Sequence, residues 1–376
     1  MTSIEQYRRE YLGKSVEELP TPSLLLDLDL FEKNITKMSE HAKQVGIYIR
    51  PHSKAHKSPE IARRQLAAGA VGICTATIQE ATAMVDAGVE GVLITSPMAG
   101  REKIQRLVAL TQKQPSLLTV VDNALHVEQL NEVACQSNVK LNVLIDIDPN
   151  LNRTGVAAGA ATIALADCIM KQSHIQLCGV QCYSGKSAHI HGYQERYRHS
   201  KEAMTPGMET FLKLKEMGYP VEIMTGGSTG TYNIDPTFGV MTELQVGSYI
   251  FMDTDYHLIG GKEKAEYDDF DNALTVLATV VSKNHSGIAT IDAGLKAMAT
   301  DRTFNPRIKG NQKIDFQFSG DEHGRLSFNE AEVSIQLGDR VEVIAPHCDP
   351  TVNLYQRFMC VRNGIVEDIW EIGGKY

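Results

Sequence analysis

Between residues 47 and 251 the sequence alternates short apolar runs with longer segments of helical periodicity, and this pattern limits the possible folds most strongly. The runs are apolar on both faces, which is typical of strands in a parallel sheet that is covered by helices. The eight runs are 47–49, 71–74, 92–95, 117–121, 141–147, 175–182, 221–224 and 244–251. The helical segments include 59–68, 78–87, 124–137, 158–172 and 195–218. Because a (β/α)8 barrel holds eight strands, we predict a TIM barrel over residues 29–260.

A ninth run, at about 21–28, precedes the barrel, and after residue 260 helical periodicity nearly disappears. Short candidate strands separated by turn residues follow at 274–281, 287–292, 333–337, 340–344, 356–362 and 364–371. This pattern predicts an antiparallel β-domain over residues 261–376, which the early strand could join. A doubly wound open sheet is the alternative to the barrel, but the chain has no GxGxxG after its first strand.

Composition excludes several classes of protein. The formal net charge of -9 and the lack of a basic run argue against non-specific nucleic-acid binding. No apolar run approaches the roughly 18 residues of a membrane span. The seven cysteines are scattered and form no CxxC pair, which indicates a reducing compartment, so we expect a cytoplasmic protein.

The turn Arg-Pro-His-Ser-Lys-Ala-His-Lys at 50–57 follows the first barrel run. Partial burial lowers the pKa of an amine, and a neutral amine at the mouth of a strand can condense with a carbonyl. Lys54 is therefore a candidate for covalent chemistry. A solvated basic loop explains the same residues equally well.

A loop of glycine, serine and threonine at 225–230 follows the seventh run. Glycines let backbone N–H groups approach phosphate oxygens, and barrels often bind phosphate after strands seven and eight. The loop slightly favours phosphate binding, and an ordinary strand-to-helix turn is the alternative. A reactive lysine and a phosphate loop in one barrel suggest pyridoxal 5'-phosphate (PLP).

Near the C-terminus, His347 and Asp349 stand two residues apart. On an extended segment their side chains point the same way, so one divalent ion could bind both. Taken alone, the pattern is explained better by a turn residue beside a surface histidine.

Several motifs together resemble the D-threonine aldolase family, which has the alanine-racemase fold (fold type III) of PLP enzymes. They are Arg-Pro-His-x-Lys-x-His-Lys at 50–57, Arg-x-Gly at 153–155, Thr-Gly-Gly-x-Thr-Gly at 225–230, Glu-Leu-Gln-x-Gly-Ser-Tyr at 243–249 and Pro-His-x-Asp-Pro-Thr at 346–351. The resemblance covers residues 21–372 and implies a barrel, a C-terminal β-domain that takes in the N-terminal strand, and a homodimer.

The resemblance also assigns roles. Lys54 would bond to the cofactor, and His189 would be the catalytic base. His347 and Asp349 would hold the metal, most simply Mn²⁺, with Mg²⁺, Co²⁺ or Zn²⁺ as alternatives. The remaining cofactor contacts would be Arg153, Tyr183, Gly227, Ser228, Thr229, Gly230, Gln245, Gly247, Ser248 and Tyr249.

The expected reaction is a retro-aldol cleavage of a β-hydroxy-D-α-amino acid, such as D-threonine, to glycine and an aldehyde. The nearest alternative is a dehydratase that acts on D-serine or 3-hydroxy-D-aspartate and releases a keto acid and ammonia. Dehydratase relatives usually carry His-x-Cys at the metal, whereas this chain has Asp349 in that place and Cys348 one residue earlier. A racemase, a non-catalytic PLP-binding protein and a metal-only hydrolase are further alternatives.

Overall fold

A computed structural model describes residues 4–375 of the chain. The chain divides into two compact units. The barrel unit comprises Lys37–Gly247 and the segment from Gly373 onward, and the β unit comprises the segment up to Thr36 and Ser248–Ile372. The boundaries therefore fall inside a helix near residue 36 and at Gly247, whereas the sequence pattern suggested residues 29 and 260.

The barrel unit is built around eight parallel strands. They are β2 (Tyr48–Ile49), β3 (Ile73–Thr75), β4 (Val92–Ile94), β5 (Leu118–Val121), β6 (Leu141–Ile147), β7 (Ile175–Cys182), β8 (Ile223–Gly226) and β9 (Glu243–Leu244). Their order is β2-β9-β8-β7-β6-β5-β4-β3. A parallel bridge between His52 and Cys74 links the two outer strands, and Cys74 N donates to Pro51 O at 2.8 Å.

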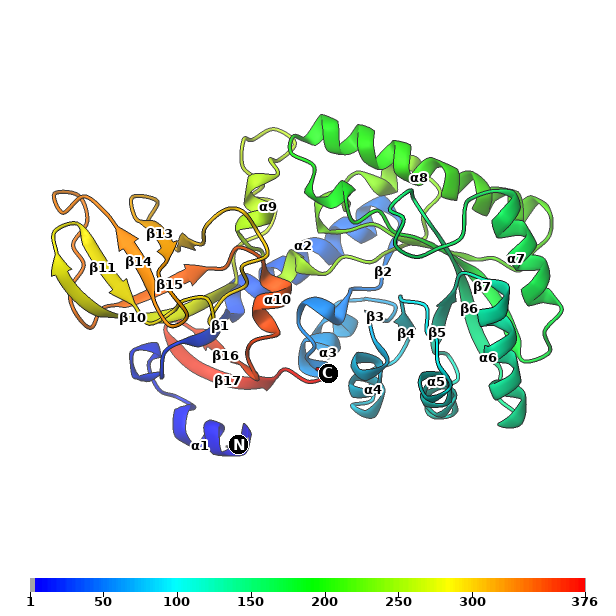
Figure 1. Cartoon of the computed structure of the whole chain (residues 1–376), viewed down its shortest axis with the longest axis horizontal. Helices are drawn as coiled ribbons and strands as arrows, with labels where there is room; N and C mark the ends of the chain where they lie inside the picture. Colours follow the sequence, from blue (N-terminus) through cyan, green and yellow to red (C-terminus); the bar gives the residue numbers. More distant parts are fainter. Residues whose placement is uncertain (1–3, 376) are drawn as a thin grey trace. The chain divides into compact units, whose positions relative to one another are not determined.

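Helices follow most strands of this unit, because parallel neighbours must be joined by a crossover connection (Figure 1). They are α3 (Pro59–Ala67), α4 (Ile78–Asp86), α5 (Arg101–Lys113), α6 (Ala124–Gln136), α7 (Ala160–Met170) and α8 (Tyr193–Glu216). α2 (Leu28–Val45) precedes β2 and passes from one unit into the other. Asn123 shows how such a helix begins: its side chain accepts a hydrogen bond from His126 N, which caps α6.

Alternate residues of the strands enter two separate cores. Val92 and Ile94 belong to the large apolar cluster that includes residues of α4 to α8. Leu93 belongs to a small inner cluster with Cys74, Leu118, Val120 and Leu144. This alternation of period two is what closing a sheet into a barrel requires.

The β unit contains nine strands. They are β1 (Ser23–Asp27), β10 (Leu274–His285), β11 (Ile288–Ile291), β12 (Arg307–Ile308), β13 (Asp315–Phe318), β14 (Gly324–Ser327), β15 (Arg340–Ile344), β16 (Arg357–Arg362) and β17 (Ile365–Glu371). Pairing runs β11-β14-β13-β12-β15-β10, and β10 pairs again with β11, so these six strands close on themselves. β1 lies between β10 and β16, antiparallel to the first and parallel to the second. Short helices α1 (Ile4–Tyr11), α9 (Thr254–Leu258) and α10 (Cys348–Val352) complete the unit.

Two predicted strands differ from the structure. The run 244–251 is a strand only at Glu243–Leu244, and Ser248–Ile250 form a 3₁₀ turn in which Tyr249 and Ile250 are fully buried. The run 333–337 buries Val333 and Ile335 but pairs with no strand. In both segments apolar residues pack into a core without a ladder of backbone hydrogen bonds, which hydrophobicity alone does not reveal.

The predicted fold class, a TIM-type barrel with an antiparallel β-domain, is confirmed by this topology. Three strands of the β unit, β12 to β14, were not predicted, because they are short and rich in polar residues. Among the described residues, no helix combines the length and apolar character that a bilayer crossing needs.

Candidate active site

Lys54 lies in a 3₁₀ turn, Ser53–Ala55, directly after β2. His52 precedes this turn with an extended backbone, and its Nδ1 accepts a hydrogen bond from Lys54 N at 3.2 Å. The other ring nitrogen, Nε2, lies 3.1 Å from Thr95 Oγ1, which follows β4. His52 therefore ties the turn to the segment that follows β4 and fixes the lysine at the carboxyl edge of the barrel.

A cavity of about 220 Å³ opens at this edge. Its lining combines residues that follow or end β2, β3, β4, β6, β7 and β9. The lining residues are His52, Lys54, Ala76, Thr95, Ser96, Arg153, Thr154, Gln181, Tyr183 and Gln245. Active sites of TIM barrels lie at the carboxyl ends of the strands, so this is the candidate active site.

The cavity brings together four of the residues that the sequence singled out: Lys54, Arg153, Tyr183 and Gln245. The guanidinium carbon of Arg153 lies 5.7 Å from the centre of the Tyr183 ring, within the range of a cation–π contact. Gln181, which belongs to none of the sequence motifs, lines the same cavity.

A chain of buried hydrogen bonds runs beneath the cavity. Gln245 Nε2 donates to Gln181 Oε1 at 3.0 Å, and Gln181 Nε2 donates to Asp146 Oδ1 at 2.8 Å. Burial raises the pKa of Asp146 to about 6, although hydrogen bonds from Gln181 and Thr154 act in the opposite direction. An ionised carboxylate can only accept hydrogen bonds, so Gln181 must donate to Asp146 through its Nε2. The Oε1 atom of Gln181 is then the acceptor for Gln245 Nε2. Because the Gln245 amide nitrogen is engaged, its carbonyl oxygen is the group that can meet a ligand.

Lys57, the second lysine of the turn, has a different environment. Its Nζ lies 3.3 Å from Glu80 Oε1, and the two side chains are only 11% and 3% exposed. Glu80 Oε2 also accepts a hydrogen bond from Ala76 N at 2.8 Å. Lys57 is thus committed to an internal ion pair and does not line the cavity, whereas Lys54 does.

The glycine-rich loop after β8 is closely packed. Gly227 has a φ of 74°, which an L side chain rarely adopts. A Cβ at Gly230 would come within 2.1 Å of Ala188 O, so only glycine fits there. Ala188 belongs to the 3₁₀ turn Ser187–His189, so His189 is a close neighbour of this loop. His189 is not among the residues that line the 220 Å³ cavity.

The loop is anchored from inside the protein by Asp235. Ser228 Oγ lies 3.0 Å from Thr231 Oγ1, which donates to Asp235 Oδ2 at 2.6 Å. Ser200 Oγ donates to the other oxygen of the same carboxylate at 2.5 Å. Asp235 is 1% exposed, and burial raises its pKa to about 6. These contacts fix the turn Thr229–Thr231.

In the β unit, His347 directly precedes α10 and Asp349 lies in its first turn. Asp349 Oδ1 accepts hydrogen bonds from Ser248 Oγ at 3.2 Å and from the Cys348 thiol at 3.4 Å. The hydroxyl of Ser248 is therefore directed at the carboxylate, although the sequence assigned it to phosphate. Tyr249 is fully buried against Phe270, with ring centres 5.7 Å apart.

His347 and Asp349 provide one nitrogen and one carboxylate donor. Within residues 4–375 no cluster of three or more metal-binding side chains occurs. Cys348 is fully buried and its backbone N donates to Asp253 Oδ2 at 2.8 Å, whereas Asp349 is partly exposed. The accessible donors are thus the imidazole and the carboxylate, a mixed pair that suits borderline divalent ions.

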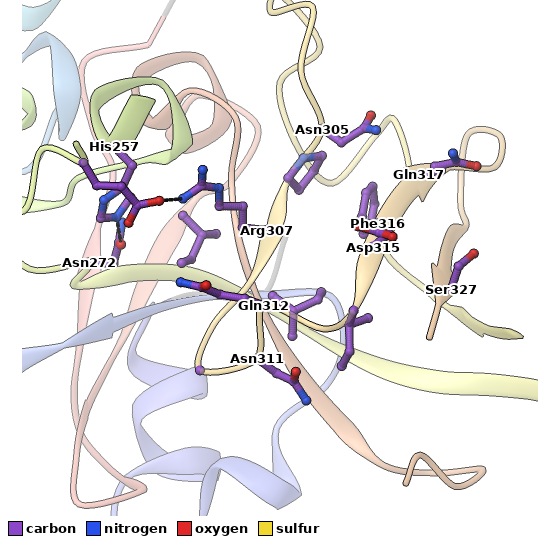
Figure 2. A pocket seen from close by; sticks show the side chains of 16 residues that line it. His257, Asn272, Asn305, Arg307, Asn311, Gln312, Asp315, Phe316, Gln317 and Ser327 are labelled. Atoms are coloured by element: carbon purple, nitrogen blue, oxygen red, sulfur yellow. Dashed lines mark hydrogen bonds and ion pairs between the residues drawn. The ribbon is translucent and has the colours of Figure 1, made fainter. Parts of the chain in front are cut away.

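A larger cavity, of about 790 Å³, lies in the β unit (Figure 2). Amide side chains such as Asn305, Asn311 and Gln312 line it, and no lysine does. Its one arginine, Arg307, donates to Glu266 Oε1 at 3.1 Å. Size alone would favour this cavity, but it offers no amine for covalent chemistry, so we assign the active site to the smaller one.

Comparison with known proteins agrees with this geometry. Residues 26–255 match the family of the alanine racemase N-terminal domain, and residues 273–361 match a putative serine dehydratase domain. A D-threonine aldolase from Arthrobacter sp. is 37% identical over 363 residues, which are 96% of this chain and 94% of the relative. The chain belongs to the D-threonine aldolase family. It is accordingly a PLP-dependent lyase of fold type III, as the sequence motifs predicted.

Other members of the wider family differ in their reactions. A 3-hydroxy-D-aspartate aldolase from Paracoccus denitrificans (strain Pd 1222) is 32% identical, over 96% of this chain and 94% of its own. A D-threo-3-hydroxyaspartate dehydratase from Delftia sp. (strain HT23) is 27% identical, over 94% of this chain and 97% of its own.

Among solved structures, a D-threonine aldolase from Filomicrobium marinum superimposes with a TM-score of 0.92 and 34% identity, covering 97% of both chains. An alanine racemase from Clostridium difficile 630 has a TM-score of 0.70 and 14% identity, covering 94% of this chain and 99% of its own, and shares the fold alone.

Proposed function

We propose that this protein is a PLP- and divalent-metal-dependent aldolase that cleaves β-hydroxy-D-α-amino acids to glycine and an aldehyde. The observation that carries the proposal is the position of Lys54. It lines a cavity at the carboxyl ends of the barrel strands, while the neighbouring Lys57 is held by Glu80. The sequence relatives named as aldolases support the choice of reaction.

The chemistry of the cavity fits PLP. Lys54 offers an amine for the cofactor's aldehyde carbon, and Arg153 offers a cation for its phenolic oxygen. Tyr183 would lie against the ring, and Gln245 would face the pyridine nitrogen. The phosphate would bind Gly227, Ser228, Thr229, Gly230 and Gly247, with Ser248 and Tyr249 nearby in the sequence.

His347 and Asp349 would hold the divalent ion. An imidazole nitrogen and a carboxylate oxygen leave most positions of a six-coordinate ion for water and substrate, which favours Mn²⁺ or Mg²⁺ over a closed structural zinc site. Co²⁺ and Zn²⁺ are the other ions that this donor pair would accept.

In the proposed reaction, the cofactor, the metal ion, Lys54 and His189 each have a separate role. Bound PLP supplies the electron acceptor for Cα–Cβ cleavage, and the divalent ion supplies positive charge at the β-hydroxyl group. Lys54 would hold the cofactor through its side-chain amine at the carboxyl edge of the barrel. His189 accepts the hydroxyl proton on a ring nitrogen as general base.

The second candidate is a dehydratase that acts on D-serine or 3-hydroxy-D-aspartate. The relative named D-threo-3-hydroxyaspartate dehydratase matches 94% of this chain and favours this alternative. The buried position of Cys348 argues against a metal site that contains this thiol. A homodimer and a cytoplasmic location remain predictions from the resemblance and from the cysteine pattern.

The deciding experiment is a product assay with D-threonine, D-phenylserine, 3-hydroxy-D-aspartate and D-serine, each with Mn²⁺, with Zn²⁺ and with EDTA. Glycine plus an aldehyde, lost in EDTA and restored by Mn²⁺, supports the proposal. A keto acid plus ammonia would replace it with the dehydratase. L-threonine serves as the stereochemical control.

A further inference from the structure

In the β unit, a chain of three charged side chains, Asp255, Arg302 and Asp301, leads to His347. Arg302 Nε donates to Asp255 Oδ2 at 2.7 Å, and Asp255 is only 6% exposed. Arg302 Nη1 donates to Asp301 Oδ2 at 2.9 Å. The same oxygen of Asp301 lies 2.7 Å from His347 Nδ1. A buried carboxylate thus fixes an arginine, which in turn fixes the aspartate that contacts the histidine.

This contact decides which ring nitrogen of His347 can bind a metal. A carboxylate oxygen that already accepts from Arg302 can only accept from the histidine, so Nδ1 carries the proton and donates it. In a neutral imidazole the other nitrogen, Nε2, then keeps its lone pair. No side chain among residues 4–375 forms a hydrogen bond with Nε2, and the His347 side chain is 20% exposed.

We propose that Asp301 is a positioning residue for the divalent metal, with Arg302 and Asp255 as its support. It would hold the His347 ring in one orientation and one tautomer, with Nε2 directed to the ion. Outer carboxylates on metal-binding histidines commonly have this effect, and their loss typically costs 10–100-fold in metal affinity. The inference rests on the proposed function, because it takes His347 and Asp349 as the ligands.

Other chemistry-bearing residues near the site do not share this arrangement. Asp349 accepts hydrogen bonds from Ser248 and Cys348, and Asp253 caps α9 and accepts from Cys348 N. Asp301 is the carboxylate that contacts an accessible metal-binding nitrogen. Its role is geometric and not catalytic, because it would touch neither substrate nor cofactor.

The test measures Mn²⁺ affinity directly, by equilibrium dialysis and by the electron paramagnetic resonance signal of free Mn²⁺. The holoenzyme, Asp301→Ala, Asp301→Asn and a control, Asp321→Ala, are compared in 0.5 M KCl. At this ionic strength the field of a distant surface charge is largely screened. The control removes the same charge from an exposed carboxylate that pairs with Lys296 at 3.6 Å in the same unit.

We expect a 10–100-fold rise in the Mn²⁺ dissociation constant for Asp301→Ala. Asp301→Asn keeps an oxygen that can accept from Nδ1, so a smaller rise is expected. Asp321→Ala should stay within about threefold of the native protein. The cofactor absorption band and the thermal unfolding of the metal-free protein should be unchanged in all variants, which separates metal loss from misfolding.

Two results have different meanings. If the native protein binds Mn²⁺ and Asp301→Ala binds it equally well, the inference about Asp301 is wrong while the proposed function stands. If the native protein itself binds no divalent ion at millimolar concentration, the metal part of the proposed function fails first. Should Asp301→Ala fold poorly, Asp301→Asn with the same dialysis decides the question.

Discussion

At the scale of single residues, the two lysines of the turn at 50–57 show how environment separates similar side chains. Lys54 lines a cavity, and Lys57 is buried beside Glu80. An amine can form a covalent bond with a carbonyl only where a ligand can reach it. We therefore expect Lys54 to bond to a ligand and Lys57 to have a structural role, although they are only three residues apart in the sequence.

The first prediction concerns these lysines. Lys54→Ala should abolish the absorption band of the bound cofactor, because the covalent link is lost. Lys57→Met should keep the band but destabilise the protein by about 3–5 kcal/mol, since Glu80 is left buried without its partner. Absorption spectra and urea unfolding measure the two effects. A band that survives in Lys54→Ala and disappears in Lys57→Met would reverse the assignment.

The second prediction concerns Asp235, whose pKa burial raises from 3.8 to about 6. The folded state prefers the protonated carboxyl, so its contribution to stability is complete below pH 3.8 and disappears as pH rises through about 6. A shift of this size corresponds to roughly 3 kcal/mol. Asp235→Asn should remove this pH dependence.

The measurement is urea unfolding of native protein and Asp235→Asn between pH 4 and 7.5 with saturating PLP. The stability of the variant relative to the native protein should rise by up to about 3 kcal/mol across this range. A constant offset from changed hydrogen bonds to Ser200 and Thr231 is allowed, because it does not depend on pH. Parallel curves for the two proteins would contradict the prediction.

The sequence pattern identified the residues of the site that differ clearly from their neighbours in the chain and missed those that do not. Lys54 and Arg153 stand out because they follow apolar runs as charged residues. Gln181 lies inside an apolar run and looked like an interruption. The register of strand pairing, which would have identified Gln181, is not visible in the sequence. Gln181 lies opposite Asp146 on β6 and opposite Thr225 on β8, so three inward polar residues form one row across the sheet.

At the scale of elements, a buried ion pair joins the first and last strands of the barrel. Arg50 Nε and Nη2 donate to the two carboxylate oxygens of Glu243 at 2.8 and 2.7 Å. The side chains are 7% and 6% exposed. Glu243 lies opposite Tyr48 where β9 pairs with β2, so the ion pair sits where the first and last strands of the barrel lie side by side.

The third prediction follows from this pair. Arg50→Met should destabilise the protein by about 3–5 kcal/mol, because it leaves the Glu243 charge buried and unpaired. The double variant Arg50→Met/Glu243→Leu should cost less than the single change, since the buried charge is gone. Chemical unfolding of both variants tests this. A double variant less stable than Arg50→Met would count against it.

Prediction of the elements from sequence worked where apolar runs and secondary structure coincide. The parallel strands were found because both of their faces are buried. The run 244–251 was extended too far, because Val246, Tyr249 and Phe251 are buried in a loop and a turn rather than in a ladder. β12 to β14 were missed for the opposite reason, because residues such as Asp315 and Gln317 on β13 face solvent.

At the scale of the whole molecule, the β unit is made from both ends of the chain. β1 lies inside its sheet, with Leu24 opposite Val276 on β10 and Leu25 opposite Met359 on β16. α1 lies outside the sheet and contributes no buried residue, although Ile4, Tyr7 and Tyr11 pack against a core cluster of the unit and Arg8 donates to Ile369 O. The two N-terminal elements therefore differ in their importance for folding.

The fourth prediction compares two truncations. Removal of residues 1–27 should prevent the β unit from folding, because it takes a strand from the interior of the sheet. Removal of residues 1–11 should leave it folded. Trp370, the one tryptophan of the chain, is 1% exposed and packs edge-on against Phe31 with ring centres 5.7 Å apart. A red-shifted emission in the longer truncation alone is expected, and native emission there would disprove the prediction.

The placement of β1 also has a consequence during synthesis. Leu25 and its parallel partner Met359 are separated by about 330 residues. Translation adds roughly 5–20 residues per second, so Met359 is synthesised tens of seconds after Leu25. During that interval three consecutive leucines, 24 to 26, belong to a strand whose parallel partner has not yet been made. A cell that makes this protein must therefore shield its first strand until ribosomes have nearly finished the chain, and holding chaperones that bind nascent apolar segments would raise its yield.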